Sequence, residues 1–164
     1  MSATIRPARA GDGPALFAIW EALRQYNASI DERIIPAAVS EREFLAGLDE
    51  VLGRDRSVAF VAEAESGCVG FVTGSIEENQ PDRLPPLHAT IGYLFVAATH
   101  RRQGIARSLF AAVAAWATKR ADVSHFEMPV LAADEEATHF WRAIGFSPFI
   151  VRLWAPLSAL DRES

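Results

Sequence analysis

The sequence predicts a single α/β domain in which helices flank a mixed β-sheet, with the element order β-α-α-β-β-β-α-β-α-β. Three observations lead to this prediction. Two amphipathic helical patterns follow a first short strand. Strand-like and helical patterns then alternate in the second half, which indicates a parallel pair of strands crossed by a helix. No repeat or linker divides the 164 residues, so we expect one domain over residues 1–156 and a tail at 157–164.

The first half of the chain is expected to form a strand, two helices and a hairpin. TIRPA (residues 4–8) is typical of a short strand, and a helix then opens at Asp12 or Gly13, with a proline in its first turn. SERE at residues 40–43 is a capping box and opens the second helix. Residues 57–77 read as two strands around a tight Ser-Gly turn, which makes an antiparallel hairpin.

The second half begins with the longest irregular stretch, ENQPDRLPPLHA at residues 78–89. Three prolines and the absence of periodicity make it a loop, and loops of this length in small domains are often functional. The elements expected after it are a strand at 90–97, a helix at 105–120, a strand at 124–131, a helix at 134–146 and a closing strand at 147–154.

Charge and composition exclude several classes of protein. A net charge of −5 argues against a general nucleic-acid binder. The single cysteine, Cys68, allows neither a disulfide framework nor a cysteine zinc site, and SGCVGF resembles a hairpin turn more than a reactive thiol site. No signal peptide or membrane-spanning run is evident, so we expect a cytoplasmic protein that does not bind membranes.

Residues 101–106, RRQGIA, place two arginines at the start of a predicted helix, where carboxylates are normally favoured. The first amides of a helix lack partners within it and attract anions. Gly104 would let a ligand approach the main chain closely. The segment could therefore hold a phosphate group; a plain turn with solvated arginines stays open as the alternative. No P-loop, dinucleotide-binding or serine-hydrolase motif accompanies it, and the four histidines lack metal-ligand spacing.

This segment also carries a family resemblance. Arg101-x-x-Gly104-x-Ala106, after the strand-like YLFVA, resembles the acetyl-CoA pyrophosphate loop of the GNAT superfamily of N-acetyltransferases, whose pattern is Arg/Gln-x-x-Gly-x-Gly/Ala. The element order agrees with that family over essentially the whole chain, and TIRPARAGDGPALFAIW is similar to its common opening.

A second signature of the family, roughly N-x-x-A-x-x-x-Y-x-x-x-G-F, is similar to DEEATHFWRAIGF. Ala137, Gly145 and Phe146 match it in register. The sequence departs from it at two positions, where Asp134 replaces the usual Asn and Trp141 the usual Tyr. That second change puts the usual proton donor in doubt.

The resemblance implies a splayed, GNAT-like mixed sheet that binds acetyl-CoA as cosubstrate, without a metal. Backbone groups of the strand before the loop would pair with the pantetheine arm, and amides of the loop would hold the diphosphate. One or more of the arginines would meet the 3′-phosphate. The residues implied in binding are Leu94, Phe95, Val96, Arg101, Arg102, Gln103, Gly104, Ile105, Ala106, Arg107, Ser108, Asp134 and Trp141.

The implied reaction is direct transfer of the acetyl group to a primary amine on a small molecule or a peptide. The amine must first lose a proton, and the candidate bases are Glu77 and Glu78, then Glu127, with Tyr93 and His88 lining the site. Acidic residues expected to rim the acceptor site would favour a cationic acceptor; they are Asp31, Glu32, Glu77, Glu78 and Asp82.

Two other functions stay open, and so does a homodimer. The first is a non-catalytic module that binds acyl-CoA and regulates, which the replacement of the family's Tyr by Trp141 favours. The second is a small-molecule binder for a different phosphate ligand.

Overall fold

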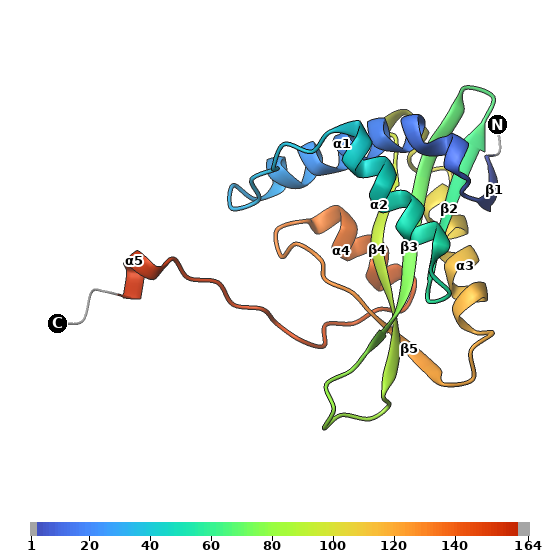
Figure 1. Ribbon diagram of the computed structural model, residues 1–164. Helices are drawn as coiled ribbons and strands as arrows, with labels where there is room; N and C mark the ends of the chain where they lie inside the picture. Colours follow the sequence, from blue (N-terminus) through green and yellow to red (C-terminus); the bar gives the residue numbers. More distant parts are fainter. Residues whose placement is uncertain (1–2, 161–164) are drawn as a thin grey trace. The chain divides into compact units, whose positions relative to one another are not determined.

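Five strands form one sheet in the order β1-β2-β3-β4-β5, with β4 and β5 parallel and the other neighbours antiparallel (Figure 1). The computed structural model describes residues 3–160 and divides into two units, the first ending at Ala133 and the second beginning at Asp134. The strands all belong to the first unit: β1 (Thr4–Pro7), β2 (Ser57–Ala64), β3 (Gly67–Glu78), β4 (Leu87–Val96) and β5 (Val123–Glu127).

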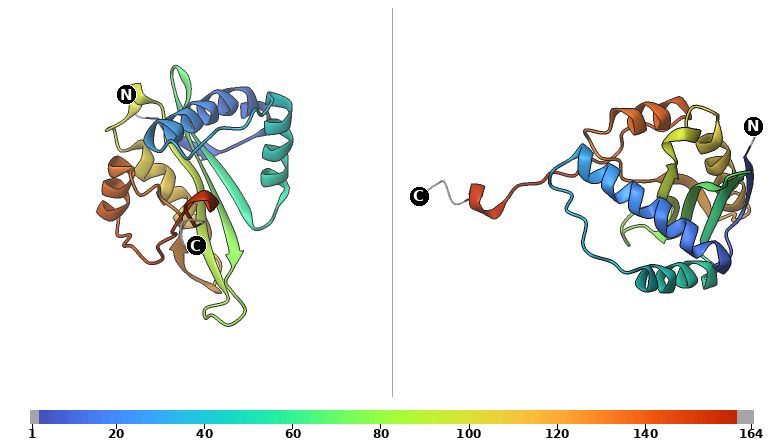
Figure 2. Two further views of the ribbon diagram at one scale, coloured as in Figure 1. Left: turned by 90° about the vertical axis from the view of Figure 1, so that its left-hand side faces the viewer. Right: turned by 90° about the horizontal axis from the view of Figure 1, so that it is seen from above.

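Helices cover both faces of this sheet (Figures 1 and 2). Helices α1 (Gly13–Ile30) and α2 (Glu41–Gly53) share a buried apolar cluster with Phe71 of β3, on what we name the α1 face. Helix α3 (Ile105–Ala117) lies on the opposite, α3 face, where a Cβ atom at Gly74 would meet Val113. Short 3-10 turns stand at Ala10–Asp12 (η1) and Ala98–His100 (η2).

The start of α2 follows the predicted capping chemistry, whereas the Asp12 side chain at the start of α1 makes no cap hydrogen bond to that helix. The Glu43 N–H donates to the Ser40 hydroxyl oxygen (3.3 Å), and the Ser40 N–H donates to the Glu43 carboxylate (2.8 Å), so SERE is a capping box. Asp12 stands at the N-cap of α1 and takes two hydrogen bonds of 2.8 Å from the Arg6 guanidinium, which ties β1 to this helix. The Arg6 guanidinium lowers the pKa of Asp12.

The loop after β3 is shorter than the sequence predicted, because Glu78 belongs to β3 and Leu87, His88 and Ala89 belong to β4. Asn79 closes the loop: its N–H donates to the Pro86 carbonyl (2.8 Å) and its side-chain amide to the Pro85 carbonyl (2.6 Å). The predicted crossover is confirmed, since α3 connects the parallel strands β4 and β5. Within the described residues, no helix is long and apolar enough to cross a membrane.

The second unit contains helices α4 (Glu135–Ala143) and α5 (Leu157–Leu160). The predicted closing strand at 147–154 is wrong, because none of these residues is in a strand. A β-prone segment becomes a strand only by pairing with another, and no β-ladder involves this segment in the described part of the chain. Pro148 also lacks the N–H that a ladder needs.

Candidate active site

Strands β4 and β5 run side by side only over the first part of β4. Their paired residues are Leu87 with Val123, Ala89 with Phe126 and Thr90 with Glu127. Beyond Thr90, the rest of β4 pairs with β3 but, among residues 3–160, with no strand on its other side. This side of β4 therefore offers main-chain N–H and C=O groups to an extended ligand. The splayed sheet that the family resemblance implies is present.

A β-bulge lies beside this opening. Thr73 pairs with Tyr93 and Gly74 with Ile91, so Gly92 is an extra residue in β4. A Cβ atom at Gly92 would lie 2.8 Å from the Thr73 hydroxyl oxygen, and this close approach favours glycine here. The bulge brings Tyr93 onto the α1 face, where its ring lies 6.2 Å from that of Phe71 and is 43% exposed.

The loop before α3 has an unusual backbone. Arg102 has φ 63° and Gly104 has φ 79°, both in the left-handed region. For a residue as large as arginine this conformation is uncommon and costs about 1–3 kcal/mol, which is typical of functional sites. Alternating left-handed residues at a helix start can turn successive N–H groups toward one concavity that suits an anion. At Gly104 a Cβ atom would meet nothing within 4 Å, so the space in front of the loop is open.

The arginines of the loop differ from one another. The Nε–H of Arg101 donates to the Val96 carbonyl (3.1 Å), and the guanidinium lies 5.2 Å from the ring centres of Tyr26 and Phe95. Arg101 thus attaches the loop to the end of β4. Arg102 and Arg107, in contrast, are exposed. Their pairing with a phosphate stays a prediction, as do the ligand contacts of Gln103, Ile105, Ala106 and Ser108.

Polar side chains gather on the α1 face near the point where β4 and β5 part; we name this the polar face. Pairing across the strands places Ser75, Thr90 and Glu127 in one row. The next row contains Glu77 opposite His88, whose ring stacks on that of His125 with centroids 6.0 Å apart. Residues alternating with these lie on the α3 face: Ile76 and Ala89 are buried there against Ala117.

Glu127 stands on the last paired rung before the strands part. One of its carboxylate oxygens, Oε1, accepts from Nε2 of His125 (3.0 Å) and from the Arg83 guanidinium (3.1 Å). The hydrogen bond from His125 has the largest effect and, together with the positive charge of Arg83, holds the pKa of Glu127 below its usual range. Glu127 is therefore ionised at neutral pH.

The structure separates the other candidate carboxylates. Glu77 lies on the polar face. Tyr93 lies on the same face of the sheet, two paired positions along β4 from Thr90. Glu78 points to the opposite face and pairs with Arg56 (3.2 Å), so the structure does not bring the two candidate bases together. Asp31, at the end of α1, is hydrogen-bonded by Arg33, which lowers its pKa to about 2. Glu32 and Asp82 are exposed.

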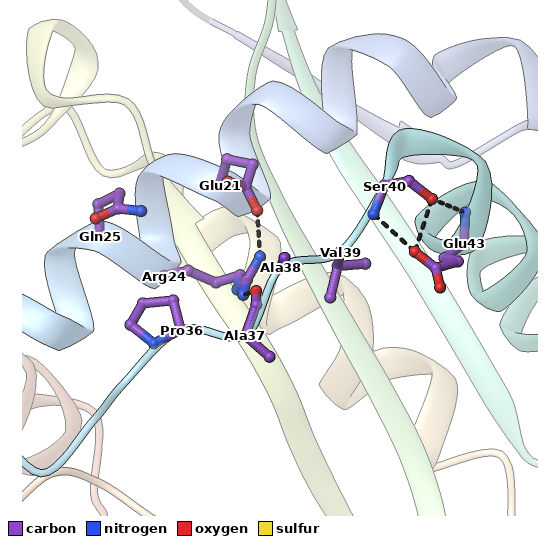
Figure 3. Close-up of a pocket in the computed structure, with 9 residues that line it drawn as sticks. All are labelled: Glu21, Arg24, Gln25, Pro36, Ala37, Ala38, Val39, Ser40 and Glu43. Carbon is purple, nitrogen blue, oxygen red and sulfur yellow. Dashed lines mark hydrogen bonds and ion pairs between the residues drawn. The ribbon is translucent and has the colours of Figure 1, made fainter.

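A groove of about 640 Å³ lies between α1 and the segment before α2 (Figure 3). Arg24 projects into it, pairs with Glu21 and donates to the carbonyl of Ala37. Polar side chains at its other end, Ser40 and Glu43, are joined in the capping box. The charged side chains Arg24, Glu21 and Glu43 thus all have partners among the residues that line this groove. None of the lining residues is a candidate catalytic residue.

Sequence reasoning missed Ser75, Thr90 and His125 on the polar face, and also Arg83 of the β3–β4 loop, which pairs with Glu127. The alternation of strand residues could have placed Ser75 on the face of Glu77, Thr90 on the face of His88, and His125 on the face of Glu127. Cys68 does not contribute a reactive thiol, because burial raises its pKa and its Sγ–H points to the Gly70 carbonyl. Among the described residues, no group of three or more His, Cys, Asp or Glu side chains could hold a metal ion.

Helix α4 of the second unit keeps the predicted local chemistry. The Asp134 carboxylate accepts from the Ala137 N–H (2.9 Å) as the N-cap. The indole of Trp141 meets the rings of Phe140 and Phe146 edge-on, each with centroids 5.0 Å apart. The participation of Asp134 and Trp141 in binding stays a prediction.

The class of the protein follows from two features: β4 and β5 part after Thr90, and the loop before α3 has positive φ at Arg102 and Gly104. Together they are typical of an α/β acyltransferase fold. The chain belongs to the acetyltransferase (GNAT) family, whose model matches residues 18–146. Comparison with the curated proteins gave no match.

Solved structures agree with this fold at low sequence identity. A tetramutant of the BH1408 protein from Bacillus halodurans is 18% identical, with a TM-score of 0.80 over 93% of this chain and 99% of that one. The aminoglycoside 6′-N-acetyltransferase AAC(6′)-IG from Acinetobacter haemolyticus is 17% identical, with a TM-score of 0.70 over 93% and 97%. AAC(6′)-Iy, in complex with a bisubstrate analogue containing CoA, is 20% identical, with a TM-score of 0.71 over 95% and 98%.

Proposed function

We propose that this protein is an N-acetyltransferase that transfers the acetyl group of acetyl-CoA directly to a primary amine. One observation carries the proposal: the unpaired side of β4 leads straight into the loop at residues 101–106, which has two left-handed residues. An extended pantetheine arm and a diphosphate are the two parts of acetyl-CoA that need such neighbouring surfaces.

Binding would follow from groups already in position. Main-chain groups of Leu94, Phe95 and Val96 pair with the amides of the pantetheine arm. Amides of the loop and of the first turn of α3 hold the diphosphate. Arg102 and Arg107 are exposed beside them and supply charge-assisted hydrogen bonds to the 3′-phosphate. Arg101 keeps the loop against β4.

The chemistry is an attack of the neutral amine on the thioester carbonyl. Charge develops on the carbonyl oxygen, and a fixed main-chain N–H of β4 stabilises it. The amine is a cation in water, so it must lose a proton first. Glu127 is ionised, stands on the last rung before the opening, and has its second oxygen Oε2 without a partner among the described residues. We assign the proton to this oxygen, directly or through one water.

The departing CoA thiolate needs little help, because a thiol has a pKa near 8.5. The indole N–H of Trp141 can donate a hydrogen bond but does not release its proton at neutral pH. The presence of Trp141 where the family usually has Tyr favours one other function, that of a regulatory module that binds acyl-CoA without catalysis.

The deciding experiment measures thiol release from acetyl-CoA with a panel of primary amines, and product mass confirms N-acetylation. Thermal shifts with acetyl-CoA, CoA, ATP and NAD accompany it. A rise in the melting temperature with acetyl-CoA, together with thiol release in the presence of an amine, supports the proposed acetyltransferase. Stabilisation without thiol release from any amine supports the regulatory module, and no preference for acetyl-CoA contradicts both.

A further inference from the structure

The side chain of Arg101 contacts two elements of the fold besides its own loop. Its Nε–H donates to the Val96 carbonyl at the end of β4 (3.1 Å). The central carbon of its guanidinium lies 5.2 Å from the ring centre of Phe95, also in β4, and 5.2 Å from that of Tyr26 in α1. The loop before α3 is therefore connected to helix α1 through the ring of Tyr26.

The two rings that face this guanidinium are held by the core. Their centroids are 6.3 Å apart and their planes are tilted by 54°, which is a favourable arrangement for an aromatic pair. Phe95 packs against the buried cluster of the α1 face, and Leu23, one turn before Tyr26, belongs to that cluster. A guanidinium within about 6 Å of a ring centre is attracted by the negative face of the ring. The rings thus give Arg101 a fixed place.

The residue that follows Arg101 has a backbone conformation that needs support. Arg102 has φ 63°, which is unfavourable for a large side chain and persists only where the surrounding structure holds it. The side chains of Arg102 and Gln103 are exposed, and the hydroxyl of Thr99 bonds to the neighbouring Nδ1 of His100 (2.9 Å). Arg101 is the adjacent residue that is attached to β4 and α1, so we expect it to supply this support.

We propose that Tyr26 is a positioning residue for the loop before α3: its ring holds the guanidinium of Arg101 and so keeps residues 101–104 in the conformation that binds acetyl-CoA. This inference rests on the proposed function, which assigns the loop to the diphosphate. Tyr26 acts on the ligand through Arg101. Without the ring, the loop populates other conformations, and the apparent affinity falls with the fraction of molecules whose loop is competent to bind.

Helix α1 offers a matched control for Tyr26. Phe17 is half-buried like Tyr26, and its ring contacts those of Trp20 (centroids 6.1 Å apart) and Phe44 (5.5 Å). It precedes Tyr26 by about 13 Å along the helix axis. Leucine at either position removes one aromatic ring from the same helix, but the ring of Tyr26 is the one that faces Arg101.

The experiment measures acetyl-CoA binding by calorimetry in Tyr26→Leu, Tyr26→Phe and Phe17→Leu, each shown by urea unfolding to be folded. Affinity should fall about three- to tenfold in Tyr26→Leu, as expected for the loss of one partly exposed contact between a cation and a ring. Tyr26→Phe keeps the ring and should restore the parent affinity. Phe17→Leu should lose stability and keep the affinity. Adding Tyr26→Leu to Arg101→Met should cause no further loss, because the guanidinium is already absent.

Two further measurements separate positioning from a general loss of structure. With an amine that is acetylated, Tyr26→Leu should raise KM for acetyl-CoA and leave kcat unchanged, since the chemical step does not involve the ring. Trypsin must take an arginine side chain into its pocket, so cleavage between Arg101 and Arg102 reports release of the loop in the protein without ligand. This cleavage should be faster in Tyr26→Leu than in the parent, and should keep the parent rate in Phe17→Leu.

Unchanged affinity for acetyl-CoA in Tyr26→Leu would overturn the proposal, and so would an equal loss in Phe17→Leu. A parent protein that does not bind acetyl-CoA would reject the proposed function, and the cleavage then decides about Tyr26 independently. Faster cleavage after Arg101 in Tyr26→Leu alone would still support its positioning role. Equal cleavage in the parent and both leucine variants would reject that role.

Discussion

The backbone N–H of Tyr93 donates to the side-chain oxygen of Thr73 at 3.0 Å, on the rung where the bulge of β4 ends. If Gly92 were a regular, paired residue of β4 and not a bulge, the alternation of the strand would direct Tyr93 to the α3 face. The hydrogen bond to Thr73 therefore holds the bulge in place. It also fixes the side chain of Tyr93, which lies between the polar face and the unpaired part of β4.

We expect Gly92→Ala to lower the free energy of unfolding by about 1–3 kcal/mol, because the new methyl group would lie 2.8 Å from the Thr73 oxygen. Denaturant unfolding measures this effect. Combining it with Thr73→Ala should cost less than the sum of the two single changes, since removal of the hydroxyl relieves the overlap. Gly47→Ala, at an exposed site in α2 with open space around it, serves as the control and should be neutral or stabilising. Additive costs in the double variant would contradict the account of the bulge.

Two glycines with positive φ allow a matched test of the loop. Gly104 (φ 79°) begins α3 and Gly67 (φ 100°) turns between β2 and β3; neither has an atom within 4 Å of a Cβ position. Valine at either site should cost about 1–3 kcal/mol through backbone strain. Only Gly104→Val should abolish the binding of acetyl-CoA, measured by calorimetry on the folded protein. Unchanged affinity in Gly104→Val would exclude the loop as the diphosphate site.

Arg102 should affect ligand binding and stability in opposite directions. Arg102→Gly should leave stability unchanged or raise it by about 1 kcal/mol, because glycine adopts the left-handed conformation without strain. Affinity for acetyl-CoA should fall by at most about 1.5–3 kcal/mol, and by less for the 3′-dephospho form. Arg101→Ala should instead destabilise the fold, since it removes the bond to Val96. Equal losses of affinity for both forms of the ligand would show that Arg102 does not meet the 3′-phosphate.

The contribution of Glu127 to the free energy of unfolding should decrease as the pH is lowered. The pKa of Glu127 is lower in the folded protein than in the unfolded chain, so its ionised form stabilises the fold above the unfolded value of about 4.3. That contribution is lost as the pH falls through the folded value. Urea unfolding of the parent and of Glu127→Gln should therefore differ most at pH 7 and converge toward pH 3. Divergence on acidification would mean that His125 and Arg83 do not stabilise the carboxylate.

Glu127→Gln also tests the assignment of the proton. We expect kcat to fall by about 10²–10⁴-fold, the usual contribution of a general base, with acetyl-CoA binding unchanged. Glu78→Gln, on the opposite face of the sheet, should affect kcat much less. Should Glu78→Gln reduce kcat more than Glu127→Gln, the assignment of Glu127 would be wrong.

Local signals in the sequence were sufficient for helices α1 to α4 and for the turn before α3, but not for α5, which lies in the expected tail. The capping box at Ser40 acts within a few residues, and the segment around Gly104 depends on its own backbone. What depends on pairing was harder to predict. The splay beyond Thr90 requires β5 to end at Glu127, and the face of Tyr93 relative to the carboxylates depends on one extra residue, Gly92. The glycine within an otherwise apolar strand was a readable sign of this bulge.

The same limit explains the closing strand that the structure lacks. Residues 147–154 have strand-like composition, yet composition does not supply a partner, and strand propensity depends on its neighbours. Glu77 and Glu78 show the complementary case, since adjacent residues of a strand point to opposite faces whatever their chemistry. Treating the two as interchangeable candidates ignored that alternation.

Trp141 gives the most demanding prediction. Its ring meets Phe140 and Phe146 edge-on, which makes it part of an aromatic cluster within its own unit. Trp141→Phe should keep the aromatic contacts and most of kcat, because a CoA thiolate leaves without strong acid assistance. Trp141→Tyr should equal or exceed the parent, since a phenol is a better proton donor than an indole.

Steady-state kinetics with saturating amine, together with calorimetry of acetyl-CoA, decide this point. Trp141→Ala is the packing control, and we expect it to lose about 3–5 kcal/mol of stability. A hundredfold fall of kcat in Trp141→Phe at unchanged acetyl-CoA affinity would assign the indole N–H a direct part in the reaction. The proton for the departing thiolate would then depend on a hydrogen bond from Trp141, and not on water.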